Sequence, residues 1–186
     1  MALNYSTLLT ETYADRSWLK DAAVILGASF LIALFAPITI HLPFTPVPIA
    51  TQGHVVLVLA ALLGSKRGAL AVLTYLFQGA VNLPVFAGGV GGLAALFGPT
   101  GGYLLGYVAA AFVTGYLVER RSERKSLSVF AAMGLGNLVI YLFGLPWLAR
   151  FCGWENALLL GLAPFVIGDL LKLVAGTKLL QKLNRV

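Results

Sequence analysis

The chain has few charged residues for its length. Asp, Glu, Lys and Arg make up 11% of the 186 residues, whereas a soluble domain typically carries about 25%. Hydrophobic residues account for 59% of the chain, and the mean hydropathy is +0.89. This composition excludes an ordinary soluble enzyme. It predicts an integral protein of the cell membrane, in contact with membrane lipid.

Metal-binding residues are scarce. The single cysteine, Cys152, cannot form an internal disulfide, and the two histidines, His41 and His54, lie thirteen residues apart. No carboxylate or thiol stands at ligand spacing from either histidine. We therefore expect no metal site and no cofactor.

Catalytic and nucleotide-binding motifs are missing as well. The sequence contains neither a Gly-x-Ser-x-Gly elbow nor an HExxH motif. The glycine-rich segment at 86–99, FAGGVGGLAALFGP, lacks the lysine and hydroxyl residue of a phosphate-binding loop and follows no predicted strand. We interpret it as a close-packed loop or re-entrant segment on the outer face. The chain is therefore predicted to be no enzyme and to carry no ATPase of its own.

Six apolar segments are candidate membrane spans, at about 22–40, 54–64, 68–83, 101–118, 127–144 and 157–180. Six spans of roughly 20 residues would use most of the chain. We therefore expect a single membrane domain over residues 1–186, without a separate soluble domain. The segments at 54–64 and 68–83 are short for a complete crossing.

Basic residues predict the orientation of the spans. The net charge is +6, and we attribute it to membrane orientation rather than to binding of nucleic acid. With a cytoplasmic N-terminus, eleven of the thirteen Lys and Arg residues fall on the cytoplasmic side. Arg150 falls in an outer loop, and Lys172 falls inside a span. We therefore predict a compact all-α bundle of six transmembrane helices with both termini cytoplasmic.

Three predicted outer loops carry Leu-Pro followed by an aromatic residue, at 42–44, 83–86 and 145–147. Proline ends a helix, and an aromatic ring can cover an apolar cavity. The loops could therefore roof a pocket that opens outward. The alternative is that they are ordinary helix ends with aromatic anchors at the membrane interface.

Small residues recur every four positions along the fourth span. Gly98, Gly102, Gly106, Ala110 and Thr114 form one row if the segment is a helix. A row of this kind lets another helix backbone approach closely. We therefore expect it to be a packing surface.

An acid and a base lie within the last apolar segment. Asp169 and Lys172 are three residues apart and would share one helix face. Ionisable groups inside a membrane usually line a ligand or ion pathway, and a buried clamp between helices is the alternative. Asn137, Tyr141 and Gln52 are polar groups that could face the same cavity or simply satisfy a neighbour.

Three segments resemble the BioY family, the biotin-binding S components of energy-coupling-factor vitamin transporters. They are PFTPVPIATQ at 43–52, LPVFAGGVGGLAALFGPTGGYLLGY at 83–107 and GDLLK at 168–172. The resemblance implies a six-helix membrane bundle that captures biotin with high affinity near the outer face. It also implies docking on an energy-coupling module made of a transmembrane scaffold protein and two ATPase subunits.

The resemblance places Asp169 and Lys172 within the ligand-binding signature of the family. Biotin offers two ureido N–H donors, one ureido carbonyl acceptor and a carboxylate. We expect Asp169 to accept from the ureido N–H groups. Lys172 could serve the ureido oxygen, the carboxylate or Asp169 itself. Five further residues are expected in the substrate site, where the aromatic ones would supply apolar walls: Tyr141, Gln52, Asn82, Phe86 and Trp147.

Asn82 departs from the pattern of the family. The resemblance leads us to expect a glycine at this position, next to the Leu-Pro-Val-Phe segment at 83–86. The asparagine is either a tolerated polar residue or an additional contact with the ligand.

Small residues on the first span predict where the chain docks. Ala23 with Gly27, and Ser29 with Ala33, are pairs spaced four residues apart. Such pairs allow close helix approach, so we expect them to contact the energy-coupling module. Three other functions stay open: a self-sufficient biotin facilitator, an S component for another vitamin, and a membrane-embedded enzyme.

Overall fold

The structure is a computed structural model that describes residues 18–40, 42–120 and 126–183. His41 and five of the basic residues behind the orientation argument lie outside these ranges. The helices are α2 (Trp18–Phe35), α3 (Gln52–Leu63), α4 (Ser65–Ala80), α5 (Leu93–Phe97), α6 (Gly101–Glu119), α7 (Ser126–Cys152), α8 (Trp154–Gly161) and α9 (Val166–Leu183), with a 3₁₀ turn η1 at Ala87–Gly89. A two-stranded antiparallel hairpin joins β1 (Thr39–Ile40) to β2 (Ile49–Ala50).

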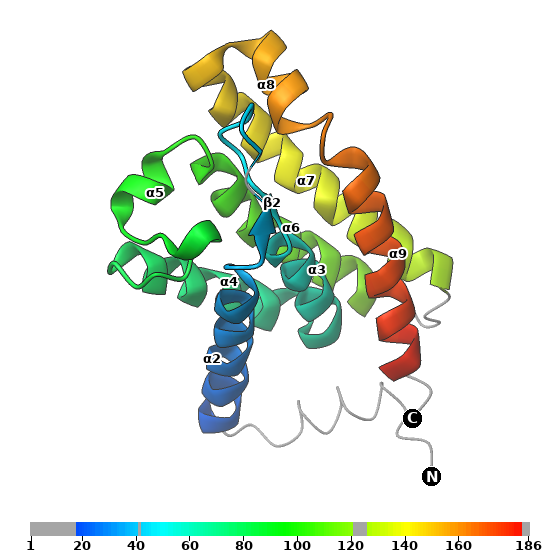
Figure 1. Cartoon of the computed structure of the whole chain (residues 1–186). Coiled ribbons are helices and arrows are strands. Elements are labelled where there is room, and N and C mark those ends of the chain that lie inside the picture. Colours follow the sequence, from blue (N-terminus) through cyan, green and yellow to red (C-terminus); the bar gives the residue numbers. More distant parts are fainter. Residues whose placement is uncertain (1–17, 41, 121–125, 184–186) are drawn as a thin grey trace.

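The protein is a helical membrane protein, and the short hairpin is the only sheet within residues 18–40, 42–120 and 126–183. Among the described residues, α2, α6 and α7 are each long and apolar enough to cross a membrane, and α8 with α9, bent by 46°, would count as a fourth span. The apolar helix α3 has only 12 residues. The helical membrane class is thus confirmed, while the count of six spans stays a prediction. The first turn of α2 and the last turn of α9 both lie at the bottom of Figure 1.

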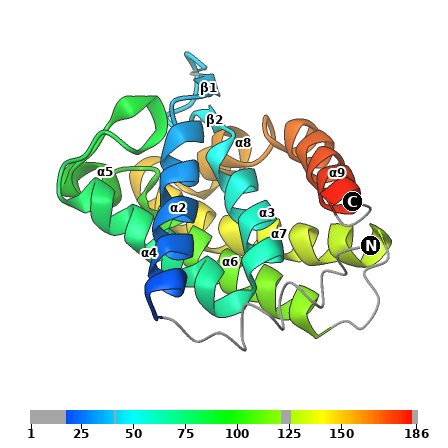
Figure 2. The ribbon, with the colours of Figure 1, turned by 90° about the horizontal axis from the view of Figure 1, so that it is seen from below.

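Helix α6 is the centre of the bundle and packs against α3, α4 and α7. The predicted row of small residues is a packing surface. A Cβ at Gly102 would collide with Trp147 of α7, and one at Gly136 of α7 would collide with the hydroxyl of Thr114. Glycine at these positions therefore lets the backbones of α6 and α7 approach closely. Seen from below, α3 lies between α2 and α9 (Figure 2), and it contacts both.

Helix α7 does not end where the sequence pattern predicted. It continues through Pro146 to Cys152, so Leu145–Trp147 is not a loop. Proline removes one backbone donor, but neighbouring helices let a membrane helix tolerate it. Here Leu148 is completely buried and Trp147 lies against α6. Packing on both sides of Pro146 therefore outweighs the break.

The last apolar segment is divided rather than continuous. Helix α8 ends at Gly161, and α9 begins at Val166 after a turn that contains Pro164. Because proline disfavours the helical conformation in the residue before it, the break falls here. Its consequence is that Asp169 lies in the first turn of α9. The amide dipoles of a helix start stabilise a negative charge at that position.

Candidate ligand-binding site

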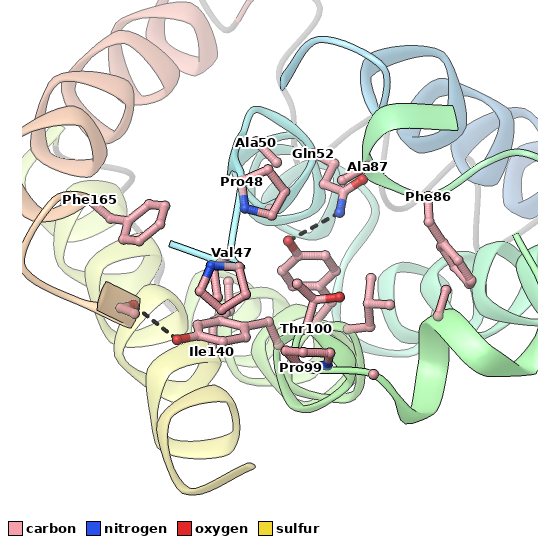
Figure 3. Close-up of a pocket in the computed structure, with 18 of the residues that line it drawn as sticks. Val47, Pro48, Ala50, Gln52, Phe86, Ala87, Pro99, Thr100, Ile140 and Phe165 are labelled. Atoms are coloured by element: carbon pink, nitrogen blue, oxygen red, sulfur yellow. Dashed lines mark hydrogen bonds between the residues drawn. The ribbon is translucent and has the colours of Figure 1, made fainter. Parts of the chain in front are cut away.

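A cavity of about 320 Å³ opens between the β1–β2 hairpin and helices α3, α6, α7 and α9. Its walls are mainly apolar, and Val47 and Pro48 of the hairpin, Ile140 of α7 and Phe165 before α9 line it (Figure 3). The glycine-rich segment supplies another wall through residues between Phe86 and Thr100. This segment is a loop with η1 and the five-residue helix α5, as its composition indicated.

Asp169 is the acidic group on the wall of this cavity. Its side chain is buried, and its Oδ2 accepts hydrogen bonds from Asn137 Nδ2, at 3.1 Å, and from the Tyr141 hydroxyl. Oδ1 lies 3.7 Å from His54 Nε2 and 3.9 Å from Lys172 Nζ. Both separations exceed ordinary hydrogen-bond distance. One carboxylate oxygen is therefore held by α7, and the other keeps lone pairs for a further donor.

Lys172 shares a face with Asp169, as the spacing predicted. Its Nζ donates a hydrogen bond to the backbone carbonyl of Ala50, at 3.1 Å. Ala50 belongs to β2, so this contact joins α9 to the hairpin beside the cavity. The ammonium group has three donors, of which the Ala50 carbonyl takes one. Lys172 therefore connects α9 to the hairpin, but it does not itself line the cavity.

Gln52 lies at the start of α3 in a buried polar network. Its Nε2 donates to the hydroxyl of Tyr107, at 3.4 Å (Figure 3), and its Oε1 accepts from the hydroxyl of Tyr75, at 3.1 Å. Gln52 and Tyr107 line the cavity, whereas Tyr75 is fully buried behind it. The network orients the amide at the cavity wall.

The predicted site residues separate into two groups. Asp169, Tyr141, Gln52 and Phe86 line the cavity. Trp147 does not; its Nε1 donates to the carbonyl of Gly98, at 2.9 Å, and its side chain covers the start of α6.

Asn82 also lies outside the cavity wall, in the turn after α4. Its φ is 72°, in the left-handed region that glycine and asparagine tolerate best. This conformation explains why the resemblance led us to expect glycine there.

Several cavity residues escaped the sequence interpretation. Tyr103 and Tyr107 line the cavity from α6, where they stand four residues apart on one helix face. Tyr103 donates a hydrogen bond to the carbonyl of Gly161, at 2.9 Å. His54 was considered only as a metal ligand, yet it lines the cavity close to Asp169. The four-residue spacing of the two tyrosines could have indicated that they share one face of α6. No sequence pattern indicated that His54 lines the cavity.

The proposed docking residues differ in accessibility. Ala23 and Gly27 are exposed on α2. Ser29 is completely buried and accepts a hydrogen bond from Gln78 of α4, at 3.2 Å. Ala33 is half-buried and packs against the hydrophobic core. The Ser29–Ala33 pair therefore packs within the chain, because it faces α4 and the core, and only the Ala23–Gly27 pair presents an open surface.

Comparison with solved structures identifies the fold. A crystal structure at 2.1 Å of the S-component for biotin from an ECF-type ABC transporter superposes with a TM-score of 0.82. The match covers 92% of this chain and 94% of that one, at 24% sequence identity. The two proteins therefore share one architecture.

Comparison with curated proteins gives higher identities. The probable biotin transporter BioY of Pyrococcus horikoshii is 39% identical over 159 residues, which cover 83% of this chain and 94% of that protein. The biotin transporter BioY of Rhodobacter capsulatus is 42% identical over 166 residues, covering 77% and 86%. The BioY family profile matches residues 6–186. The chain thus belongs to the BioY family, a family of membrane transporters and not of enzymes.

Proposed function

We propose that this protein is the biotin-binding S component of an energy-coupling-factor transporter. One observation carries the proposal: Asp169 presents an oriented carboxylate oxygen to a mainly apolar cavity of about 320 Å³. Ligand pockets for small molecules span about 300–1,000 Å³ and combine apolar walls with a few placed polar groups. The relatives named as biotin transporters, at around 40% identity, support biotin as the ligand.

The polar groups of the cavity match the chemistry of biotin. Asp169 Oδ1 can accept a ureido N–H, because Asn137 and Tyr141 occupy only Oδ2. Lys172 does not line the cavity, but it has donors beyond the one that holds Ala50, and we assign one of these to a polar group of the ligand near Asp169. Phe86 and Tyr141 supply aromatic walls for the fused rings.

The membrane arrangement is part of the proposal. We place six helical spans in the bilayer, with α3 and α4 as short spans, α8 and α9 as one bent span, and both termini in the cytoplasm. Uphill uptake would then require a transmembrane scaffold protein and two ATPases, because the sequence contains no phosphate-binding loop. Ala23 and Gly27, the exposed small residues of α2, are the proposed docking contact.

A binding titration tests the central claim. Purified protein in detergent is titrated with biotin and, separately, with riboflavin, thiamine and pantothenate. We expect saturable binding of biotin alone, and a loss of about ten- to a hundredfold in affinity for Asp169→Asn, since a charge-assisted hydrogen bond is replaced by a weaker one. Binding of another vitamin in place of biotin would overturn the assignment of the ligand. Unchanged biotin affinity in Asp169→Asn would overturn the assignment of the site.

A further inference from the structure

The cavity wall carries a carboxylate but no lysine or arginine. Asp169 is on the wall, and none of the Lys and Arg residues within 18–40, 42–120 and 126–183 lines the cavity. His54 is on the wall as well, but both of its ring nitrogens are buried. Biotin carries a second charged group, the carboxylate at the end of its valerate tail. An anion in an apolar cavity is costly unless a cation pairs with it, so these walls disfavour a buried tail carboxylate.

Lys172 is the cation close to the cavity and must be weighed as a partner for the tail. Its Nζ lies 3.9 Å from Asp169 Oδ1 and donates to the Ala50 carbonyl, and the residue is not on the cavity wall. Under the proposed function Asp169 holds the ureido group of biotin. Lys172 therefore lies at the ureido end of the ligand, and a tail that extends away from Asp169 also extends away from Lys172.

The cavity has a buried end and an exposed rim. Gln52 and Asp169 are 3% and 8% exposed. The lining residues that are exposed within the described part of the chain are Pro46 of the hairpin loop and Val90 and Ala94 of the glycine-rich segment. Under the proposed membrane arrangement both segments belong to outer loops. The rim is therefore apolar, uncharged and open to water.

The glycine-rich part of the rim lies across the cavity from Asp169. Phe165 and Phe86 are on opposite sides of the cavity (Figure 3). The Phe165 carbonyl accepts a hydrogen bond from the backbone N–H of Asp169, at 2.8 Å, and the backbone N–H of Phe86 donates to the Val90 carbonyl, at 2.9 Å. In biotin the urea and the valerate tail are attached to opposite ends of the fused rings. A biotin whose ureido group meets Asp169 therefore directs its tail toward Val90 and the rim.

We propose that the site binds amides of biotin, joined through the tail carboxyl group, as well as free biotin. This inference rests on the proposed function and extends its substrate class. The carboxylate of free biotin stays in water at the rim, so a neutral amide in its place removes no contact with a charged side chain. The open rim also leaves room for a group attached beyond the amide, such as a lysine.

Titrations with matched ligands test the proposal. Purified wild-type protein in detergent is titrated with biotin, biotinamide, biotin methyl ester and ε-N-biotinyl-lysine. We expect each derivative to bind with an affinity within about tenfold of that of biotin. A tail carboxylate held by a charge-assisted contact would instead lose more than about tenfold when it is neutralised. A loss of that size for any of the derivatives would overturn the proposal.

Variants of the charged pair give a second readout. Lys172→Met should weaken biotin and biotinamide by the same factor, because the ammonium group acts at the ureido end. The comparison of two ligands on one variant cancels any effect of the substitution on folding. If Lys172→Met weakens biotin at least about threefold more than biotinamide, Lys172 binds the tail carboxylate and the proposal is wrong.

The same titrations separate this proposal from the proposed function. If the wild type binds biotin but not the derivatives, the extended substrate class fails and the proposed function stands. If the wild type binds neither biotin nor the derivatives, the proposed function fails as well.

Discussion

Tyr75 donates a hydrogen bond to Gln52 Oε1 from behind the cavity wall, at 3.1 Å, and is itself completely buried. Its ring also meets Phe86 edge to face, with centroids 5.5 Å apart. One residue of α4 therefore supports both a polar and an aromatic member of the wall without reaching the cavity. Rigid support of this kind determines how precisely a site holds its ligand.

Tyr75→Phe should weaken biotin binding through Gln52. The substitution keeps the ring against Phe86 and removes only the hydroxyl, so Gln52 Oε1 loses its donor. We expect a loss of roughly 1 kcal/mol in stability and about three- to tenfold in biotin affinity, measured by thermal unfolding and titration. The double variant with Gln52→Leu is the control. Losses that add in the double variant would show that Tyr75 does not act through Gln52.

Variants of Asp169 and Lys172 can distinguish two hypotheses. Either the pair binds the ligand, or it only holds helices together. Lys172→Ala should release the Ala50 carbonyl and weaken biotin binding by about tenfold or more, from the loss of a charge-assisted contact. The double change Asp169→Asn with Lys172→Met removes both charges. If the pair is a ligand site, thermal stability recovers in the double variant but biotin affinity does not. Recovery of both together would support the clamp.

Asn82 should tolerate glycine but not a β-branched residue. Its φ of 72° suits Asn82→Gly, which we expect to change stability by less than about 0.5 kcal/mol. Asn82→Val should cost about 1–3 kcal/mol, because a β-branched side chain strains the left-handed conformation. Thermal unfolding of both variants gives the comparison. Since Asn82 is not on the cavity wall, Asn82→Gly should bind biotin like the wild type, and weaker binding would make it a ligand contact.

Gly27→Leu should disturb docking and leave the ligand site intact. A Cβ at Gly27 would meet no atom of the described residues within 4 Å, so we expect the fold to accept a larger side chain there. Co-purification with the energy-coupling module should fall at least several-fold, with biotin binding in detergent unchanged. Gly134→Leu on α7 is the matched control, because a Cβ at Gly134 would likewise have no described atom within 4 Å. Equal co-purification of both variants would contradict docking at Gly27.

A transport assay on the isolated protein distinguishes an S component, which needs partner subunits, from a self-sufficient facilitator. Reconstituted alone in vesicles, the protein should bind biotin but not concentrate it, because the sequence contains no phosphate-binding loop. Addition of the scaffold protein and the two ATPases should make biotin accumulation ATP-dependent. Rapid biotin equilibration by the lone chain, at a rate unaffected by the partners, would favour the facilitator.

The membrane class, the helix-packing row and the shared face of Asp169 and Lys172 were predictable from the sequence because each follows from local periodicity. The course of α7 through Pro146 was not, since packing of Leu148 and Trp147 outweighs a local breaking signal. The position of Ser29 was not predictable either. A small-residue pair looks alike whether it faces a partner protein or α4.

The candidate site was predictable where polar residues interrupt apolar spans, as Asp169 and Tyr141 do. His54 and Tyr75 could not be assigned, because their roles depend on distances between helices that are remote in sequence. A family resemblance indicates which segments contribute to the site. Only the structure shows that Oδ2 of Asp169 already accepts hydrogen bonds from Asn137 and Tyr141.

The two carboxylate oxygens of Asp169 are expected to be constrained in different ways during evolution. Oδ2 joins α9 to Asn137 and Tyr141 of α7, while under the proposed function Oδ1 receives the ligand. A glutamate at position 169 would displace both carboxylate oxygens by the length of one methylene. It would lose the hydrogen bonds to Asn137 and Tyr141 even if its charge still suited the ligand. Evolution toward a different vitamin is therefore easier at residues that touch the ligand alone, such as the cavity-lining residues of the hairpin, than at this carboxylate. Position 169 should stay aspartate while the surrounding walls diverge.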